Sequence, residues 1–113
     1  MRMFTEDDFE WFRFIERLKK SGMPIKEIKE FIDLYEQGDS TIEQRRDLIH
    51  ARKKEVERQM EELQETLDFI TYKCWFYDEA AKAGTTKVPQ TMPLEDMPPK
   101  IREIKERCGI NKY

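Results

Sequence analysis

Residues that could do chemistry are few and scattered in this chain of 113 residues. His50 is the only histidine, so no second imidazole can share a metal ion with it, and we expect it on the surface. Cys74 and Cys108 are far apart in the sequence and do not form a metal-ligand pair. The four glycines are each isolated, so there is no glycine-rich loop to hold a phosphate. We therefore predict that the protein is not an enzyme and uses no metal ion or other cofactor.

Acidic side chains are plentiful, but they are mixed with basic ones. Charged residues make up 40% of the chain, with 24 acidic and 21 basic side chains. The spacing of Glu55, Arg58 and Glu62 is typical of a solvated helix face, where each ion pair contributes roughly 0.2–0.5 kcal/mol. A net charge of -3 gives no general attraction to nucleic acid, so such a contact would need a local basic patch.

One local basic patch is present. Five cations surround the short link Ser21-Gly22-Met23: Arg13, Arg17, Lys19, Lys20 and Lys26. They could complement the dipoles of the adjoining helix ends, or they could grip phosphate beside a helix N-terminus. Because no base-reading element accompanies them, the second interpretation predicts contact with a nucleic-acid backbone only.

The element that dominates the chain is a predicted helix over residues 41–83, which contains no Gly or Pro. Apolar residues recur at every seventh position, and a second row lies four residues after the first, which is the seam of a coiled coil. The first row is Ile42, Ile49, Val56, Leu63, Ile70 and Tyr77, and the apolar part of the second row is Met60, Leu67, Cys74 and Ala81. At 1.5 Å per residue this helix would be roughly 64 Å long. Its apolar stripe therefore needs a partner.

The two halves of this helix differ in apolar width. In the first half the second row carries Arg46 and Lys53, so the seam there is half polar. From Val56 onward the seam is apolar, and aromatic residues widen it, which predicts that this end covers both a partner helix and another element. We expect Cys74, which falls in the seam, to be a small buried hydrophobic residue.

Two shorter helices should precede the long one as a hairpin. Thr5 and Asp8 form a capping box at the start of the first, and Phe4 and Phe9 are spaced for a hydrophobic staple. This helix should end near Lys20. The second should run from Ile25 to about Gln37, after which Ser40 or Thr41 should cap the long helix. The first helix is so rich in aromatic residues that part of them should stay exposed, a feature typical of interfaces.

The last segment, 85–113, holds four of the five prolines. We expect a loosely ordered tail with a short helix over Lys100 to Arg107, docked through apolar residues such as Met97. No apolar run approaches the roughly 20 residues of a membrane span. Two thiols without a signal peptide indicate the reducing cytoplasm.

Several ordered segments resemble the second half of the DNA-binding domain and the dimerisation helix of MerR-family transcriptional regulators. They are Phe4-Thr5-Glu6-Asp7-Asp8-Phe9, the run from Phe14 to Lys29 that includes Lys20-Ser21-Gly22-Met23-Pro24, the run Gly38-Asp39-Ser40-Thr41-Ile42-Glu43-Gln44-Arg45, and the heptad helix ending Tyr72-Lys73-Cys74-Trp75-Phe76-Tyr77. The resemblance covers residues 2–83. It implies an antiparallel coiled-coil homodimer, and it implies that Lys19, Lys20 and Lys26 contact DNA backbone.

The family begins with a helix-turn-helix and a β-hairpin wing, which would precede Arg2 here. The sequence is therefore interpreted as a truncated form, a misplaced start or a natural short form, for which DNA binding should be weak or absent. Metal-sensing relatives carry two cysteines in the loop after the dimerisation helix, and 84–99 contains none. An aldehyde-responsive branch carries a cysteine near the position of Arg17, which is also lacking here. Neither effector class is indicated.

Together these observations predict an all-α fold: a helical hairpin (1–38), a long dimerisation helix (39–84) and a C-terminal tail (85–113). The function predicted is that of a MerR-type regulator whose dimer geometry couples an effector to operator shape. The alternative is a stand-alone helical interaction module without DNA-reading activity. Six residues should carry the association of two chains: Ile49, Val56, Met60, Leu63, Leu67 and Ile70.

Overall fold

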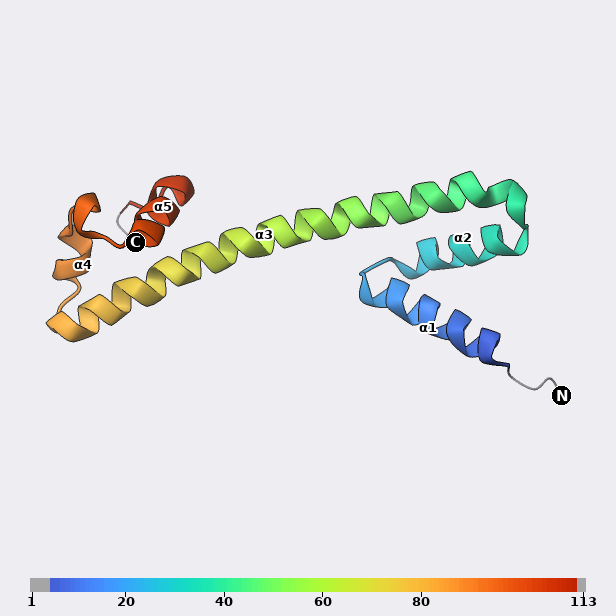
Figure 1. The fold of residues 1–113 in the computed structure, drawn as a ribbon, viewed down its shortest axis with the longest axis horizontal. Coiled ribbons are helices and arrows are strands. Elements are labelled where there is room, and N and C mark those ends of the chain that lie inside the picture. The colour runs from blue at the N-terminus through green and yellow to red at the C-terminus, as the bar shows by residue number, and fades with distance from the viewer. Residues whose placement is uncertain (1–4, 112–113) are drawn as a thin grey trace. The chain divides into compact units, whose positions relative to one another are not determined.

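The computed structural model describes residues 5–111, and these residues form helices and no strands. The all-α prediction is thus confirmed. The helices are α1 (Glu6–Lys20), α2 (Ile25–Glu36), η1 (Asp39–Thr41), α3 (Ile42–Ala83), α4 (Lys87–Thr91), η2 (Leu94–Asp96) and α5 (Pro99–Cys108) (Figure 1). The chain divides into two compact units at Gln59, so α3 contributes to both. Within residues 5–111, no helix is at once long and apolar enough to cross a membrane.

Helix α1 begins as its sequence predicts. The backbone N–H of Asp8 donates to Thr5 Oγ1 at 3.3 Å, and the backbone N–H of Thr5 donates to Asp8 Oδ2 at 3.0 Å. This capping box satisfies two backbone donors that the first turn of a helix leaves unpaired. The predicted staple involves Phe4, which lies outside the described residues. At the other end Gly22 has φ +85°, a left-handed conformation that glycine adopts without strain.

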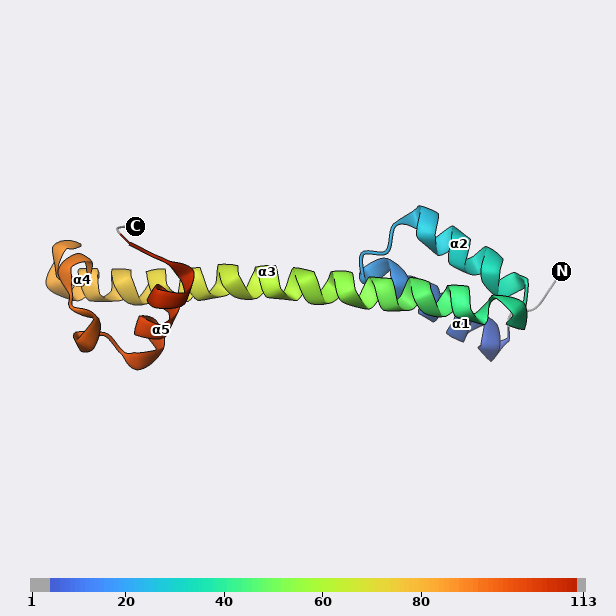
Figure 2. The same ribbon diagram turned by 90° about the horizontal axis from the view of Figure 1, so that it is seen from above.

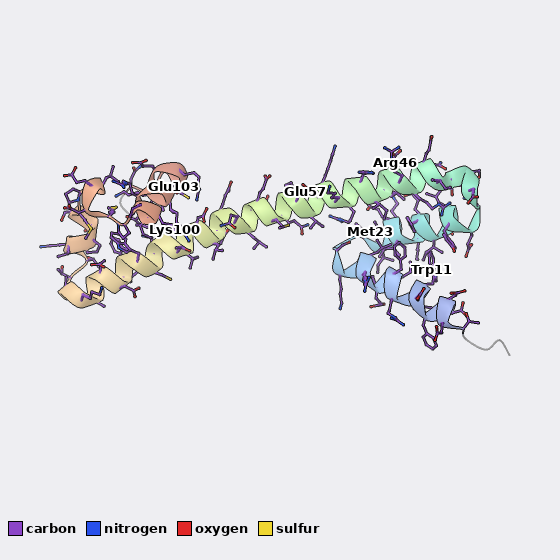
Figure 3. The ribbon with its side chains drawn as sticks, viewed as in Figure 1. Trp11, Met23, Arg46, Glu57, Lys100 and Glu103 are labelled. Carbon is purple, nitrogen blue, oxygen red and sulfur yellow. The ribbon has the colours of Figure 1, made fainter. Side chains whose placement is uncertain are left out.

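The first unit is built around a small core between α1, α2 and the start of α3. Its buried residues are Leu18, Met23, Ile28 and Phe31, with Trp11, Phe14, Ile15, Ile32 and Leu48 packed against them. Figure 3 labels Met23 and Trp11 in this core. The rings of Trp11 and Tyr35 stack across the hairpin at 4.4 Å between centroids. Phe9 and Phe12 remain 53% and 52% exposed, as the excess of aromatic residues on α1 predicts.

The junction between α2 and α3 differs from the predicted cap. The turn η1 precedes α3, and Thr41 is buried, with its hydroxyl directed at two carbonyl oxygens, that of Leu34 at 2.5 Å and that of Gly38 at 2.9 Å. The Thr41 hydroxyl also accepts a hydrogen bond from Arg45 Nε at 3.1 Å. It therefore points back at the hairpin rather than at the free N–H groups of α3. Because burial leaves a hydroxyl without water, it pairs with the nearest carbonyl instead.

The second unit folds the C-terminal segment back onto the end of α3 (Figure 2). Its core consists of Tyr72, Phe76, Met97, Ile101, Ile104 and Ile110. Asp68 of α3 is largely buried and forms an ion pair with Arg107 of α5. Gln64 Nε2 also donates to Asp68 Oδ1 at 2.9 Å.

The C-terminal segment is more ordered than its prolines suggest. The predicted short helix is present as α5, but α4 and η2 precede it. Pro99 occupies the first turn of α5, where its missing N–H costs nothing, and Gly109 ends the helix in the left-handed conformation. Met97 and Ile104 are only 3% and 2% exposed. Pro93, Pro98 and Pro99 thus lie at the starts of η2 and α5, whereas Pro89 is buried within α4. The apolar residues between them dock the segment.

Candidate functional site

The stripe predicted to bind a second chain is exposed along α3. Its centre is the most open part, with Met60, Leu63 and Leu67 exposed by 64%, 68% and 57%. Ile70 and Ile49, on either side, are exposed by 48% and 39%, whereas Val56 is half-buried. Cys74, predicted to be buried, is exposed in the single chain. Five of the six predicted dimerisation residues are thus at least 39% exposed in the single chain, and leaving such apolar side chains in water is costly.

In the second unit this stripe is distinct from the face of α3 that the chain itself covers. Tyr72, Phe76 and Ala80 follow one another at four-residue spacing, and all three are buried in the unit. Leu63, Leu67 and Ile70 lie on another side of the helix, since about 3.6 residues complete a turn, and they stay exposed. The C-terminal helices thus occupy one apolar face and leave the other uncovered.

Charge is divided unevenly along α3. Residues 42–59 carry six basic and four acidic side chains, whereas residues 60–83 carry two basic and six acidic ones. The first half is therefore net positive and the second net negative. An antiparallel partner would place opposite charges beside each other, and a parallel partner would place like charges together.

The predicted DNA-contact lysines lie around the turn between α1 and α2. Lys20 and Lys26 are exposed, and Lys19 forms an ion pair with Glu16 at 3.3 Å. No side chain caps the N-terminus of α2, which follows Pro24. Uncapped N–H groups and nearby ammonium groups favour a phosphate oxygen electrostatically.

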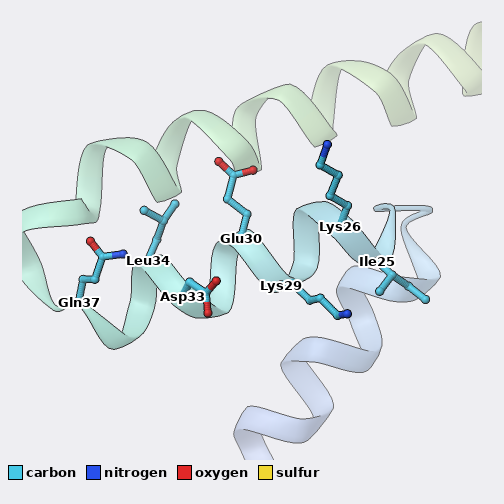
Figure 4. Close-up of a pocket in the computed structure, with 7 residues that line it drawn as sticks. All are labelled: Ile25, Lys26, Lys29, Glu30, Asp33, Leu34 and Gln37. Atoms are coloured by element: carbon cyan, nitrogen blue, oxygen red, sulfur yellow. The ribbon is translucent and has the colours of Figure 1, made fainter.

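The outer side of α2 carries a shallow hollow of about 740 Å³ that includes Lys26. Its lining mixes charges and apolar groups: Ile25, Lys26, Lys29, Glu30, Asp33, Leu34 and Gln37. Figure 4 shows Lys26 and Lys29 extending from α2 in different directions. With Glu30 and Asp33 among them, these residues do not form a uniformly basic surface.

One contact of the turn was not predicted from the sequence. Arg52, on the first half of α3, donates from Nη1 to the carbonyl oxygen of Gly22 at 2.9 Å. The bond holds the turn against the helix that carries the apolar stripe. Its partners are 30 residues apart, and no local spacing signals such a pair. Arg52 thus belongs to the candidate site as a positioning residue for the turn.

A second, apolar hollow of about 310 Å³ lies between α2 and the start of α3. Phe31, Ile42, Arg45, Arg46, Ile49 and His50 line it. His50 is exposed, as expected. Across residues 5–111, no three His, Cys, Asp or Glu side chains are grouped so that they could hold a metal ion.

Comparison with known proteins identifies the family. A family model described as "MerR, DNA binding" matches residues 9–71, more than half of the chain. The chain belongs to the MerR family. The matched region includes the turn lysines and the six residues of the predicted dimerisation stripe, whereas α4 and α5 lie beyond it.

Two curated relatives carry regulatory names. An uncharacterized HTH-type transcriptional regulator of Haemophilus influenzae is 40% identical over 86 residues, which is 76% of this chain and 64% of the relative. The HTH-type transcriptional regulator AdhR of Bacillus subtilis is 31% identical over 49 residues, which is 43% of this chain and 35% of the relative. This MerR-family chain thus spans less than two thirds of either relative. No solved structure matches it.

Proposed function

We propose that this chain acts in a homodimeric, cytoplasmic transcriptional regulator and supplies its dimerisation helix and part of its DNA contact. The observation that carries the proposal is the exposed stripe on α3, in which Met60, Leu63 and Leu67 are each more than half exposed. Such a surface gains free energy when a second apolar surface covers it, at roughly 25 cal/mol per Å² of apolar area removed from water. A second copy offers a matching stripe with the same heptad spacing.

The two helices are proposed to run antiparallel. The first half of α3 is net positive and the second half net negative, so antiparallel pairing places Arg52, Lys53 and Lys54 of one copy nearer the acidic half of the other. Parallel pairing would instead bring like charges together along the whole helix. Although exposed pairs contribute little individually, the sum of many decides between two orientations of the same stripe.

The turn between α1 and α2 is the proposed DNA contact. Lys20 and Lys26, with Lys19 beside them, would approach phosphate oxygens near the uncapped N-terminus of α2. The names of both relatives describe transcriptional regulators. In a dimer, α3 would fix the distance between two such turns, so an effector that shifts α3 would change the shape of the operator DNA.

The mass of the protein in solution tests the dimer. Light scattering at micromolar concentration should give about twice the chain mass of 13.8 kDa. Sedimentation equilibrium over a dilution series should then give the dissociation constant. A compact, helical monomer at these concentrations would refute the proposal.

The DNA contact is tested by removing two lysines. Lys20→Gln with Lys26→Gln should weaken binding to a random DNA duplex at low salt. It should also lower the slope of log K against log salt by about 2, because each lost phosphate contact contributes close to one. The control, Lys87→Gln with Lys100→Gln, removes the same charge from exposed positions outside α3 and should leave the slope nearly unchanged. If both double variants lost the same affinity for DNA, the effect would come from net charge and not from contacts at the turn.

A further inference from the structure

We infer the register in which two copies pair: Ile49 of one chain faces Cys74 of the other, and Tyr77 of each copy enters the apolar hollow beside Ile42 and Ile49 of its partner. This inference rests on the proposed antiparallel dimer. It adds the alignment of the two helices and a site for one aromatic side chain.

The spacing of the stripe restricts the alignment. Along α3, a member of the second row follows the first row by four residues, and the next member of the first row follows after three. When one helix is reversed, its layers repeat in the same order only if each first-row residue faces a second-row residue. Alignments that satisfy this condition differ from one another by a whole heptad.

Three such alignments cover all six predicted dimerisation residues from Ile49 to Ile70, and they differ in which other seam residues they leave uncovered. In the first alignment Ile42 faces Cys74, and Tyr77 and Ala81 face no seam residue of the partner. In the second, Ile49 faces Cys74, and every seam residue from 42 to 81 faces a seam residue of the partner. In the third, Val56 faces Cys74, and Ile42 and Arg46 face no seam residue of the partner. Ile42 and Tyr77 are 52% and 59% exposed, so only the second alignment covers both.

In this second alignment the layers suit the residues they bring together. Met60 meets Leu63 on both sides of the two-fold axis, and these are the two most exposed residues of the stripe. Leu67 then meets Val56. The two polar residues of the second row, Lys53 and Arg46, meet Ile70 and Tyr77, where long side chains can lie along the apolar surface with their charges in water.

The hollow in the first unit lies where this alignment places Tyr77. Arg46, which faces Tyr77, lines the hollow together with Ile42 and Ile49 on the turns before and after it. The volume of about 310 Å³ exceeds the roughly 150 Å³ that accommodates a benzene ring. Arg46 could lie over the ring, and the phenol oxygen could remain at the rim in water. Phe31 would contact the opposite side of the ring, which extends the interface from α3 to α2.

Cysteine cross-linking tests the alignment in the full chain. Cys108→Ser removes the exposed thiol outside the stripe and leaves Cys74 as the only cysteine. In that background, each of the three alignments is reported by one added cysteine that can form a disulfide with Cys74 of the partner. The variants are Ile42→Cys for the first alignment, Ile49→Cys for the second and Val56→Cys for the third. The reason is that a disulfide needs Cα atoms within about 7 Å, whereas a heptad shifts them by roughly 10 Å. With oxidised glutathione, Ile49→Cys should give the covalent dimer, and the other two should remain mostly non-covalent.

Each other outcome has a distinct meaning. Cross-linking through Ile42→Cys or Val56→Cys would overturn the register while leaving the antiparallel dimer intact. Cross-linking of the Cys108→Ser protein alone would place Cys74 against Cys74 and show a parallel pair. A chain that sediments as a monomer would overturn the proposed function together with the register.

The hollow is tested by Tyr77. Tyr77→Ala should raise the dimer dissociation constant at least about tenfold, because a buried aromatic ring is a typical interface anchor. Tyr77→Phe should change it less than about threefold, because the ring remains in the hollow. Val88→Ala, at a 43% exposed apolar residue of α4, is the control and should have no effect. If Tyr77→Ala matched Val88→Ala, the assignment of the hollow would be wrong.

Discussion

The second half of α3 has two apolar faces, and they have different environments in the single chain. Tyr72 and Phe76 are 3% and 6% exposed because α5 and the residues around it cover them. Leu63 and Leu67 are 68% and 57% exposed on the same helix. Both faces are built from large apolar side chains at helical spacing. Composition and periodicity therefore identify an apolar face, but only the presence of a covering element tells a core from an interface.

The largest effect should come from charging the exposed face. Leu63→Glu with Leu67→Glu should weaken dimerisation by more than about a thousandfold, because it puts four carboxylates into one interface without partners. The monomer should lose much of its helix signal in circular dichroism, since the middle of α3 would be left without packing.

The matched control for this change is Val88→Glu with Leu94→Glu. These residues are 43% and 41% exposed and lie outside α3, so the control should remain a helical dimer. If the Leu63 and Leu67 variant sedimented as a stable, fully helical monomer, the distinction between the two faces would have no functional meaning.

The covered face should respond differently to a change in its core. Ile104→Ala removes a side chain that is 2% exposed, and it should destabilise the second unit by about 2–5 kcal/mol, the usual cost of such a cavity. Urea unfolding followed by tryptophan fluorescence should detect this through Trp75, which packs against that core. Amide exchange should accelerate in α5 while the stripe stays able to pair.

The outcome for the dimer distinguishes the two faces. We expect the dissociation constant of Ile104→Ala to stay within about fivefold of the wild type, because the substituted residue is not on the stripe. If Ile104→Ala weakened dimerisation as strongly as it destabilised the second unit, pairing through the exposed face would depend on the packing of the covered face.

Local signals predicted the elements of this fold well. The capping box of Thr5 and Asp8 and the glycines fixed the ends of α1 and α3, since such signals act within a few residues. The wide apolar end of α3 correctly indicated a covering element, which is the C-terminal segment, whereas the partner helix stays a prediction. The docking of that segment was expected, but its helices α4 and η2 were not. Proline-rich composition describes the backbone of that segment but not the burial of Met97 and Ile104.

Contacts between distant residues were beyond the reach of the sequence. The ion pair of Asp68 with Arg107 and the bond from Arg52 to Gly22 join residues 39 and 30 positions apart. No periodicity relates such partners, because tertiary packing alone brings them together. The exposed stripe, in contrast, is a periodic feature of one helix, and its residues could be named in advance.

The smallest effect should come from the surface of α3 that belongs to neither face. Arg58 and then Gln59 donate hydrogen bonds to the Glu55 carboxylate, and they lower the pKa of Glu55 from 4.5 to about 2. A pKa below the unfolded value means that these bonds stabilise the folded protein above pH 4.5, and that the stabilisation is lost as the pH falls toward 2. Because the pair is exposed, salt and water should keep its contribution small.

The contribution of these hydrogen bonds to stability can be detected from melting temperatures measured between pH 2 and pH 7. Glu55→Gln should melt slightly below the wild type at pH 7, and the two curves should converge as the pH falls from about 4.5 to about 2. The control, Glu57→Gln, changes the same charge at an exposed site two residues along (Figure 3), so subtracting its profile removes the general effect of net charge. If the melting temperatures of Glu55→Gln and the wild type differed by the same amount at every pH, the hydrogen bonds would not distinguish the charged carboxylate of Glu55 from the neutral one. If Glu55→Gln lowered the melting temperature more than Ile104→Ala does, the surface hydrogen bonds would contribute more to stability than the packed core, contrary to our expectation.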